Sequence, residues 1–238
     1  MVVLVVKAQR GGSQSRLVLC DDGKLYVLKM HPNPQGRNVL ANEALGTILM
    51  RGLGFLVPEW RPVRINLQSI SIFPELAMTT MDGITFPARG IHFGSEFIGG
   101  PDFDLFDLMP ESRKHMLANA GQFPAVDLFD LWANHHDERQ CLYRRTKGTG
   151  PYEAFFIDNG HLFGGPNWLG GDRPGPSVSL QLRKVQNIEQ SMKIIEREIP
   201  KLLPQAIRQI PREWYKDDII ALSERLLKRV AGLRTALD

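Results

Sequence analysis

The stretch from Phe129 to Gly160 constrains the fold of this chain most strongly, because it returns to its own starting point. It contains the end of an amphipathic helix, a polar cluster around Asp137, an apolar strand, a glycine-rich turn, and a second apolar strand that ends at Asp158. Two short strands joined by such a turn fold back on each other. The pattern therefore predicts a hairpin that brings Asp137 and Asp158 into one neighbourhood.

Two carboxylates that share a site repel each other unless a cation or a proton lies between them. Mg²⁺ prefers one or two carboxylates together with phosphate oxygens, and so suits this pair. In phosphoryl transfer one carboxylate receives the proton of the attacking hydroxyl, while another holds the metal against the nucleotide phosphates. A simpler interpretation also exists, in which Asp137 is a solvated loop acid and Asp158 forms a turn before Asn-Gly.

The amino-terminal part of the chain contains a second group of candidate residues. Segments 2–6, 16–20 and 25–29 have the β-branched, apolar composition of strands, and the first two flank a glycine pair. Glycine lets a backbone approach phosphate oxygens, and the Ser13 and Gln14 side chains would add donors. Lys29 ends the third strand.

A helix is predicted over 37–51, and Glu43 is its only acid. A lone acid on a helix usually faces water, but Glu43 is the sole acidic candidate on this helix for a partner of Lys29.

These segments resemble the HipA-like kinases, which are similar in outline to protein kinases and phosphatidylinositol kinases. The resemblance lies in Asp-Leu-Trp-Ala-Asn at 130–134, Asp-Glu-Arg-Gln at 137–140, Ile-Asp-Asn-Gly at 157–160, the Gly-x-Gln-x-Arg loop at 12–16 and the run at 33–43. It implies an ATP- and Mg²⁺-dependent kinase. Within that comparison Asp137 is the catalytic base, Asp158 binds metal, and Gly12, Ser13, Gln14 and Lys29 contact the phosphates.

One position departs from the protein-kinase pattern, in which an asparagine five residues after the catalytic aspartate is a second metal ligand. Leu142 occupies that position here, so Gln140 or Asn134 would have to replace it. A pseudokinase that keeps the fold is therefore a second hypothesis. A third takes His135, His136 and Asp137 as a metal-dependent phosphohydrolase cluster, although adjacent histidines diverge on a strand or helix.

The predicted fold is α+β and bilobal, like that of protein kinases. Residues 1–97 would form an antiparallel sheet with one helix, and residues 98–238 a mainly helical lobe. The remaining elements are strands over 60–67, 69–73 and 76–81, a hinge over 96–100, helices over 110–120 and 125–133, a mobile loop over 164–176, and two closing helices, from Val185 to Ile199 and from Pro211 to Leu237. At the hinge, the resemblance implies that Glu96 and Phe97 contact the nucleotide.

Composition and net charge limit the classes of ligand and partner that this chain is expected to bind. A net charge of +3 over 238 residues is too small to indicate nucleic-acid binding, but it is compatible with an anionic ligand such as ATP. No apolar run reaches the length of a membrane span, and the opening Met-Val-Val-Leu-Val-Val segment is typical of a strand rather than a signal peptide. Cys20 and Cys141 belong to no paired pattern, which favours free thiols in a reducing cytoplasm. The phosphoryl acceptor, a protein hydroxyl or a small alcohol, is not specified by the sequence.

Overall fold

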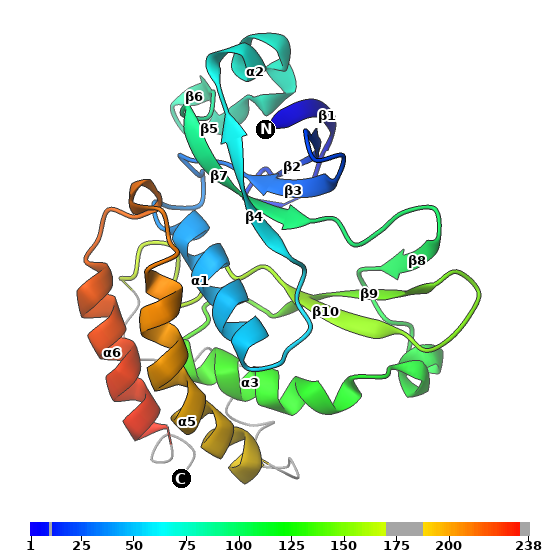
Figure 1. Ribbon diagram of the computed structural model, residues 1–238, viewed down its shortest axis with the longest axis vertical. Helices are drawn as coiled ribbons and strands as arrows, with labels where there is room; N and C mark the ends of the chain where they lie inside the picture. Colours follow the sequence, from blue (N-terminus) through cyan, green and yellow to red (C-terminus); the bar gives the residue numbers. More distant parts are fainter. Residues whose placement is uncertain (10, 170–187, 234–238) are drawn as a thin grey trace.

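The computed structural model describes residues 1–9, 11–169 and 188–233. They form a strand-rich half and a helix-rich half (Figure 1). The predictions for Val185, Leu237 and the later part of the glycine-rich loop lie outside the described residues. Within the described ranges, no helix combines the length and apolarity needed to cross a membrane.

A five-stranded antiparallel sheet forms the strand-rich half, in the order β1-β2-β3-β7-β4. Its strands are β1 (Val2–Ala8), β2 (Arg16–Cys20), β3 (Leu25–Lys29), β4 (Trp60–Ile65) and β7 (Gly90–Glu96). Strand β1 lies at one edge, and its register with β2 shifts twice along its length. Three of its apolar side chains, Val3, Leu4 and Val6, are about half exposed. The antiparallel sheet predicted for the first half is thus confirmed, although its strands are not all the predicted ones.

Two of the strands predicted for this sheet are wrong. Residues of the 69–73 segment belong to a short helix, α2 (Leu67–Ile72), because the Asn66 side chain caps it by accepting a hydrogen bond of 2.7 Å from the Ser69 backbone N–H. Strand β5 (Met78–Thr80) pairs only with β6 (Gly83–Thr85), in a separate two-stranded sheet. The Ser-Ile-Ser-Ile alternation resembles a strand, but the cap favours a helical turn.

Helix α1 (Val39–Gly52) lies between the five-stranded sheet and the helices of the other half (Figure 1). Almost all of its residues are buried, and its apolar side chains belong to the larger of two hydrophobic cores. Although α1 follows the first strands in sequence, it therefore packs mainly with the helical half.

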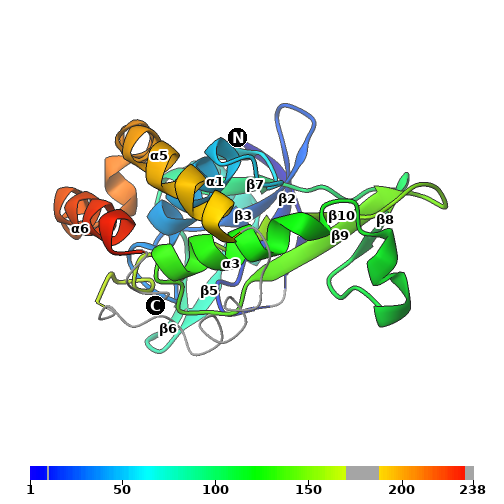
Figure 2. The ribbon, with the colours of Figure 1, turned by 90° about the horizontal axis from the view of Figure 1, so that it is seen from below.

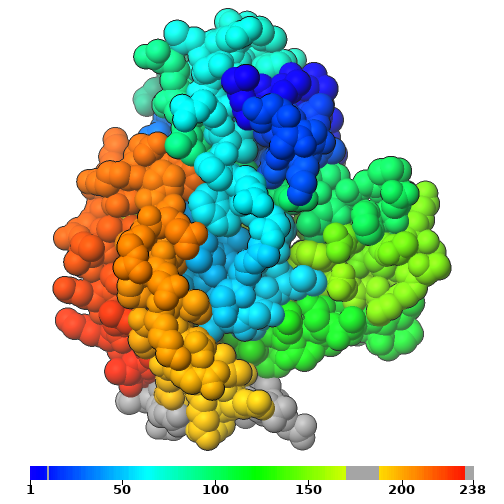
Figure 3. All heavy atoms as spheres, in the orientation of Figure 1, coloured from blue at the N-terminus to red at the C-terminus, as the bar shows by residue number. Residues whose placement is uncertain are grey.

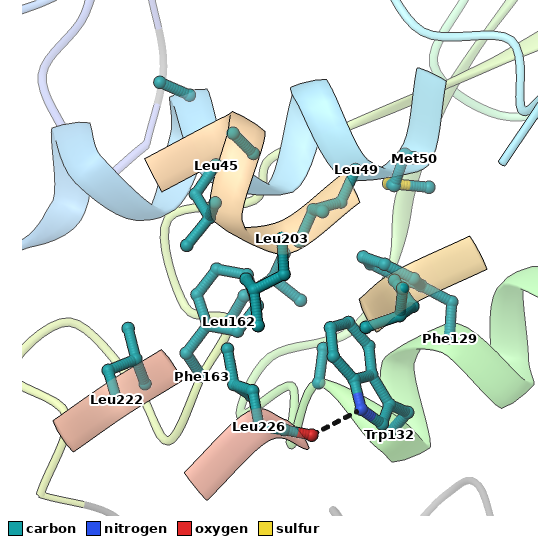
Figure 4. Packing of buried hydrophobic residues seen from close by; sticks show 14 of the residues in the cluster. Leu45, Leu49, Met50, Phe129, Trp132, Leu162, Phe163, Leu203, Leu222 and Leu226 are labelled. Atoms are coloured by element: carbon teal, nitrogen blue, oxygen red, sulfur yellow. Dashed lines mark hydrogen bonds between the residues drawn. The ribbon is translucent and has the colours of Figure 1, made fainter. Parts of the chain in front are cut away.

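In the described part of the second half, three helices surround that core: α3 (Phe123–Trp132), α5 (Ile188–Ile207) and α6 (Ile219–Gly232). The Trp132 indole crosses the core and donates to the Leu226 carbonyl at 3.1 Å (Figure 4). Helix α5 continues through Pro200 and Pro204. Helix α6 begins at Ile219 rather than near Pro211, because the Asp218 carboxylate accepts from two backbone N–H groups and caps it there.

A three-stranded sheet projects from one side of the helical half (Figures 1 and 2). Its order is β10-β9-β8, with β8 (Phe103–Phe106), β9 (Gln140–Thr146) and β10 (Glu153–Ile157). The predicted hairpin of β9 and β10 is confirmed, whereas β8 was not expected. The helix predicted over 110–120 is also wrong: two 3-10 segments, Glu111–Met116 and Ala120–Gln122, occupy this region.

Candidate active site

A cleft of about 570 Å³ lies between the five-stranded sheet, the β9–β10 hairpin and α1. In the space-filling view the surface is indented between the first strands, in blue, and the projecting β8–β10 sheet, in green (Figure 3). Nine of the ten sequence-predicted site residues line the cleft: Gly12, Ser13, Lys29, Glu43, Glu96, Phe97, Asp137, Gln140 and Asp158. The exception is Gln14.

Three charged side chains from distant parts of the chain meet at the back of this cleft. The Lys29 ammonium, at the end of β3, lies 2.5 Å from Glu43 Oε1 on α1. The same nitrogen lies 2.8 Å from Asp158 Oδ1, directly after β10. Lys29 and Glu43 are buried, and Asp158 is about a quarter exposed toward the cleft. The predicted partner of Lys29 is therefore in contact with it.

The charges in this group perturb one another. Burial lowers the pKa of Lys29, but the attraction of Glu43 and Asp158 is stronger, so the net pKa is raised and the ammonium stays charged. Burial raises the pKa of Asp158, but Lys29 reverses this effect and lowers the pKa to about 2. For Glu43, burial outweighs the attraction of Lys29 and raises the pKa. Asp158 is thus ionised at neutral pH and available to bind a cation.

The backbone at Asp158 is unusual, with φ at +60°. This left-handed conformation is uncommon for a residue with a side chain and persists only where the surroundings hold it. The next residue supplies that support: Asn159 accepts from Arg139 Nη1 at 2.7 Å and donates to the Thr47 hydroxyl at 3.2 Å. The Asp158 carboxylate is therefore directed by contacts to α1 and to the loop before β9.

Arg139 makes the contacts that connect this loop to its neighbours, and no role for it was predicted from the sequence. Its side chain is 9% exposed, and its guanidinium makes a two-point contact with the Asp130 carboxylate through Nε, at 2.9 Å, and Nη2. Its Nη1 also donates to the Ile157 carbonyl at 3.0 Å. Arg139 therefore joins α3, the Asp137 loop and the end of β10. In sequence it is one of three consecutive charged residues, which more often face water.

Asp137 lies in the loop between α3 and β9, where its Oδ1 accepts from the Glu138 backbone N–H at 2.8 Å. Gln140 begins β9 and pairs in register with Ile157, the residue before Asp158. Both side chains line the cleft beside Asp158. Leu142 also lines it, so the position of the second kinase metal ligand contributes an apolar surface.

The glycine loop divides into two parts. Gly12 and Ser13 line the cleft, while the Gln14 side chain is turned toward β5, where it donates to the Thr79 carbonyl at 2.6 Å and accepts from its N–H at 2.9 Å. Arg16 is buried and donates to the carbonyls of Glu75 and Ala77, each at 2.5 Å. The prediction of phosphate contacts from Gln14 is therefore corrected: Gln14 and Arg16 brace the loop.

At the hinge, Glu96 and Phe97 line the cleft, and their contact with a nucleotide stays a prediction. Both backbone donors are engaged within the protein, since Glu96 N–H donates to the Glu59 carbonyl at 2.7 Å and Phe97 N–H donates to the Leu25 carbonyl at 2.8 Å. The Glu96 carboxylate pairs with Lys24 at 2.9 Å. Any nucleobase contact made by these two residues would therefore use a carbonyl oxygen or the Phe97 ring.

The two adjacent histidines do not act together. His135 is buried with its Nδ1 3.4 Å from Asp130 Oδ1, whereas His136 is exposed and its backbone N–H donates to the His161 carbonyl at 3.0 Å. Among the residues that the structure describes, no group of three or more His, Cys, Asp or Glu side chains could hold a metal. The geometry thus does not support the phosphohydrolase hypothesis.

The two halves and the cleft between them define a protein-kinase-like fold. The Golgi casein kinase with Mn and ADP bound has a TM-score of 0.64 at 12% identity, covering 99% of this chain and 72% of its own. A second structure of the Golgi casein kinase gives 0.63 at 12%, covering 97% and 70%. The proinflammatory kinase CtkA of Helicobacter pylori gives 0.55 at 13%, covering 96% and 90%.

At such identities the structural matches establish the fold and not the activity. No family profile matches the sequence, and no curated protein sequence matches it. The protein-kinase-like part of the sequence prediction is therefore confirmed, while the HipA-like assignment stays a prediction.

Proposed function

We propose that this protein is an ATP-dependent, HipA-like kinase that transfers the γ-phosphoryl group to a hydroxyl. The observation that carries the proposal is the meeting of Lys29, Glu43 and Asp158 at 2.5 and 2.8 Å in a cleft that Asp137 also lines. Residues 1–97 and 98–238 would be its two lobes. The two cysteines are buried free thiols, which is consistent with a reducing cytoplasm.

The chain's own residues would divide the work of nucleotide binding. Lys29, oriented by Glu43, would contact the phosphates, and the backbone at Gly12 and Ser13 would cover them. Asp158 and Gln140 would hold Mg²⁺, because both offer oxygen ligands to the cleft and the metal prefers such ligands. Bound Mg²⁺ would neutralise phosphate charge. The Mn and ADP in one Golgi casein kinase structure support a similar use of metal and nucleotide here.

Asp137 would accept the proton of the acceptor hydroxyl. Asp137 lines the cleft, as Gln140 does, and its Oδ1 accepts from the Glu138 backbone N–H at 2.8 Å. A base of this kind contributes roughly 10²- to 10⁴-fold to the rate.

The test is phosphoryl transfer from radiolabelled ATP to a mixture of protein acceptors and to the protein itself. Asp137→Asn and Asp158→Asn are expected to fold normally and to lose transfer by about 10²-fold or more. Glu138→Gln, a matched neutral change at the adjacent exposed acid, is expected to keep it. Retained transfer in both aspartate variants would overturn the assignment.

One observation favours a second function, that of a nucleotide-binding pseudokinase. Leu142 presents an apolar side chain where protein kinases use a metal-binding asparagine. This hypothesis predicts that the wild-type protein binds ATP, measured by calorimetry with and without Mg²⁺, but transfers no label.

A further inference from the structure

One buried polar side chain on α1 fastens that helix to the segment that follows Asp158. Asn42 is fully buried, and its Nδ2 donates to the carbonyls of Gly160, Leu162 and Gly165 at 2.9, 3.0 and 3.2 Å. Its Oδ1 accepts from the Trp168 indole N–H at 2.7 Å. A single amide thus contacts four residues that are more than a hundred positions away in sequence.

The same face of α1 packs so closely against the segment after Asp158 that a Cβ at either of two glycines would make a short contact. A Cβ at Gly46, one turn after Asn42, would lie 2.7 Å from the Asn159 Cβ and 2.5 Å from a Leu162 methyl carbon. A Cβ at Gly160 would lie 3.0 Å from Glu43 Oε1. A shift of the segment relative to α1 would therefore disturb the neighbours of both Glu43 and Asp158.

Asn42 does not line the cleft, so it would not touch a nucleotide. It adjoins Glu43 in sequence, and its nearest carbonyl partner, Gly160, lies two residues after Asp158. The two residues whose carboxylates contact Lys29 therefore each lie within two positions, in sequence, of Asn42 or of one of its hydrogen-bond partners. The Asn42 side chain matches its surroundings because its two amide N–H groups are shared among three carbonyls and its oxygen accepts from one indole N–H.

We infer that Asn42 is a positioning residue that sets the Asp158 carboxylate relative to the Lys29–Glu43 pair, by holding residues 160–168 against α1. The inference rests on the proposed kinase function for its catalytic consequence. The coupling of the two segments is a structural property that can be measured without activity.

Asn38, the residue directly before α1, offers a matched control. It is also fully buried, but its side chain points to another region: Nδ2 donates to Asp217 Oδ2 at 2.7 Å, and Oδ1 accepts from the Lys216 N–H at 3.3 Å. Asn42→Ala and Asn38→Ala therefore each remove a buried amide near the start of α1. Only the first releases residues 160–168.

The first measurement is hydrogen exchange in the full-length protein, read by mass spectrometry on peptides that cover 159–168. Asn42→Ala is expected to accelerate exchange there by about tenfold or more, whereas Asn38→Ala changes it by less than about twofold. Unchanged exchange in Asn42→Ala, or equal acceleration in both variants, would overturn the inference. If Asn42→Ala fails to fold, Trp168→Phe decides, because it removes the indole donor to Asn42 and keeps an aromatic ring at a position that packs in the core, and it should give a smaller acceleration in the same peptides.

The second measurement is the Mg²⁺ concentration for half-maximal phosphoryl transfer, together with kcat. Asn42→Ala is expected to raise that concentration by about fivefold or more and to lower kcat, because Asp158 is misplaced, while Asn38→Ala leaves both within about twofold. Accelerated exchange with unchanged Mg²⁺ dependence would refute the positioning role. If the wild-type protein transfers no phosphoryl group, the proposed function fails, and the exchange result still decides whether Asn42 couples the two segments.

Discussion

The Lys29 ammonium lies 2.8 Å from Asp158 Oδ1, although the two residues are 129 positions apart in sequence. This contact links the end of a strand in the five-stranded sheet to the end of the β9–β10 hairpin. Because Glu43 contacts the same ammonium from α1, one lysine joins three elements. The arrangement of the cleft therefore depends on a positive charge at this position.

Replacing Lys29 with methionine should leave the buried Glu43 carboxylate and the partly exposed Asp158 carboxylate without their cation. We expect the free energy of unfolding at pH 7 to fall by roughly 3–5 kcal/mol, measured by urea denaturation, and ATP binding to be lost. The decrease should be smaller at pH 5, since Glu43 has a raised pKa and can take up a proton. Lys24→Met removes a pair with Glu96 in which the lysine is 53% exposed, so it should cost less than about 1 kcal/mol. Equal losses in the two variants would contradict the central role of Lys29.

Lysine at position 139 is not expected to take over the role of Arg139. The three guanidinium nitrogens of Arg139 bind Asp130, Ile157 and Asn159, and a single ammonium cannot reproduce this planar arrangement. We expect Arg139→Lys to lower the free energy of unfolding by roughly 2–4 kcal/mol and to weaken phosphoryl transfer. The control is Arg51→Lys, whose exposed pair with Glu59 should contribute less than about 1 kcal/mol. Normal stability in Arg139→Lys would show that the fork geometry is dispensable.

Alanine at Gly46 should destabilise the protein, contrary to the usual effect within a helix. Replacing a helix-interior glycine with alanine normally stabilises by about 0.5–1 kcal/mol. At Gly46 the new methyl group would overlap Leu162 and the Asn159 Cβ, so we expect a loss of roughly 1–3 kcal/mol in thermal or urea unfolding. In Gly232→Ala, at the end of α6, the added Cβ meets no atom of the described residues within 4 Å, and stability should be unchanged or higher.

Acid should destabilise the five-stranded sheet through His92. Burial lowers the pKa of this imidazole from 6.5 to about 4, and its Nδ1 accepts from the His31 N–H at 3.0 Å. The unfolded chain therefore takes up a proton at a higher pH than the folded one, so this contribution is complete above pH 6.5 and is lost as the pH falls toward 4. The shift corresponds to roughly 3 kcal/mol. In His92→Asn, stability at pH 7 should be lower, but its decrease between pH 6.5 and pH 4 should be shallower; an unchanged slope would assign the effect to other groups.

The sequence was most informative where local chemistry determines structure. The first three strands, the helix with Glu43 and the Asp137–Asp158 hairpin follow from apolar periodicity and glycine turns, and all are present. The pairing of Lys29 with Glu43 was also expected, but only from the resemblance to kinases. Local signals failed at residues 67–72, where a side-chain cap favours helix over the strand that the alternating serines and isoleucines indicate.

The buried polar residues could not be predicted, because their partners are distant. Asn42 is one of several polar residues in its helix, and nothing nearby indicates that three carbonyls from 160–165 will surround it. Arg139 likewise resembles a surface residue in sequence. Gln14 shows the opposite error: its place in a glycine loop suggested a ligand contact, but its amide pairs with the Thr79 backbone.

The irregular register of β1 affects how this molecule behaves toward its own copies. A straight edge strand with exposed Val3, Leu4 and Val6 would offer an open row of backbone donors and acceptors for another sheet to extend. The register of β1 with β2 shifts twice, and such irregularities increase the twist of an edge strand. We therefore expect the irregular β1 ladder to disfavour edge-to-edge pairing between copies of the chain, despite its exposed apolar side chains.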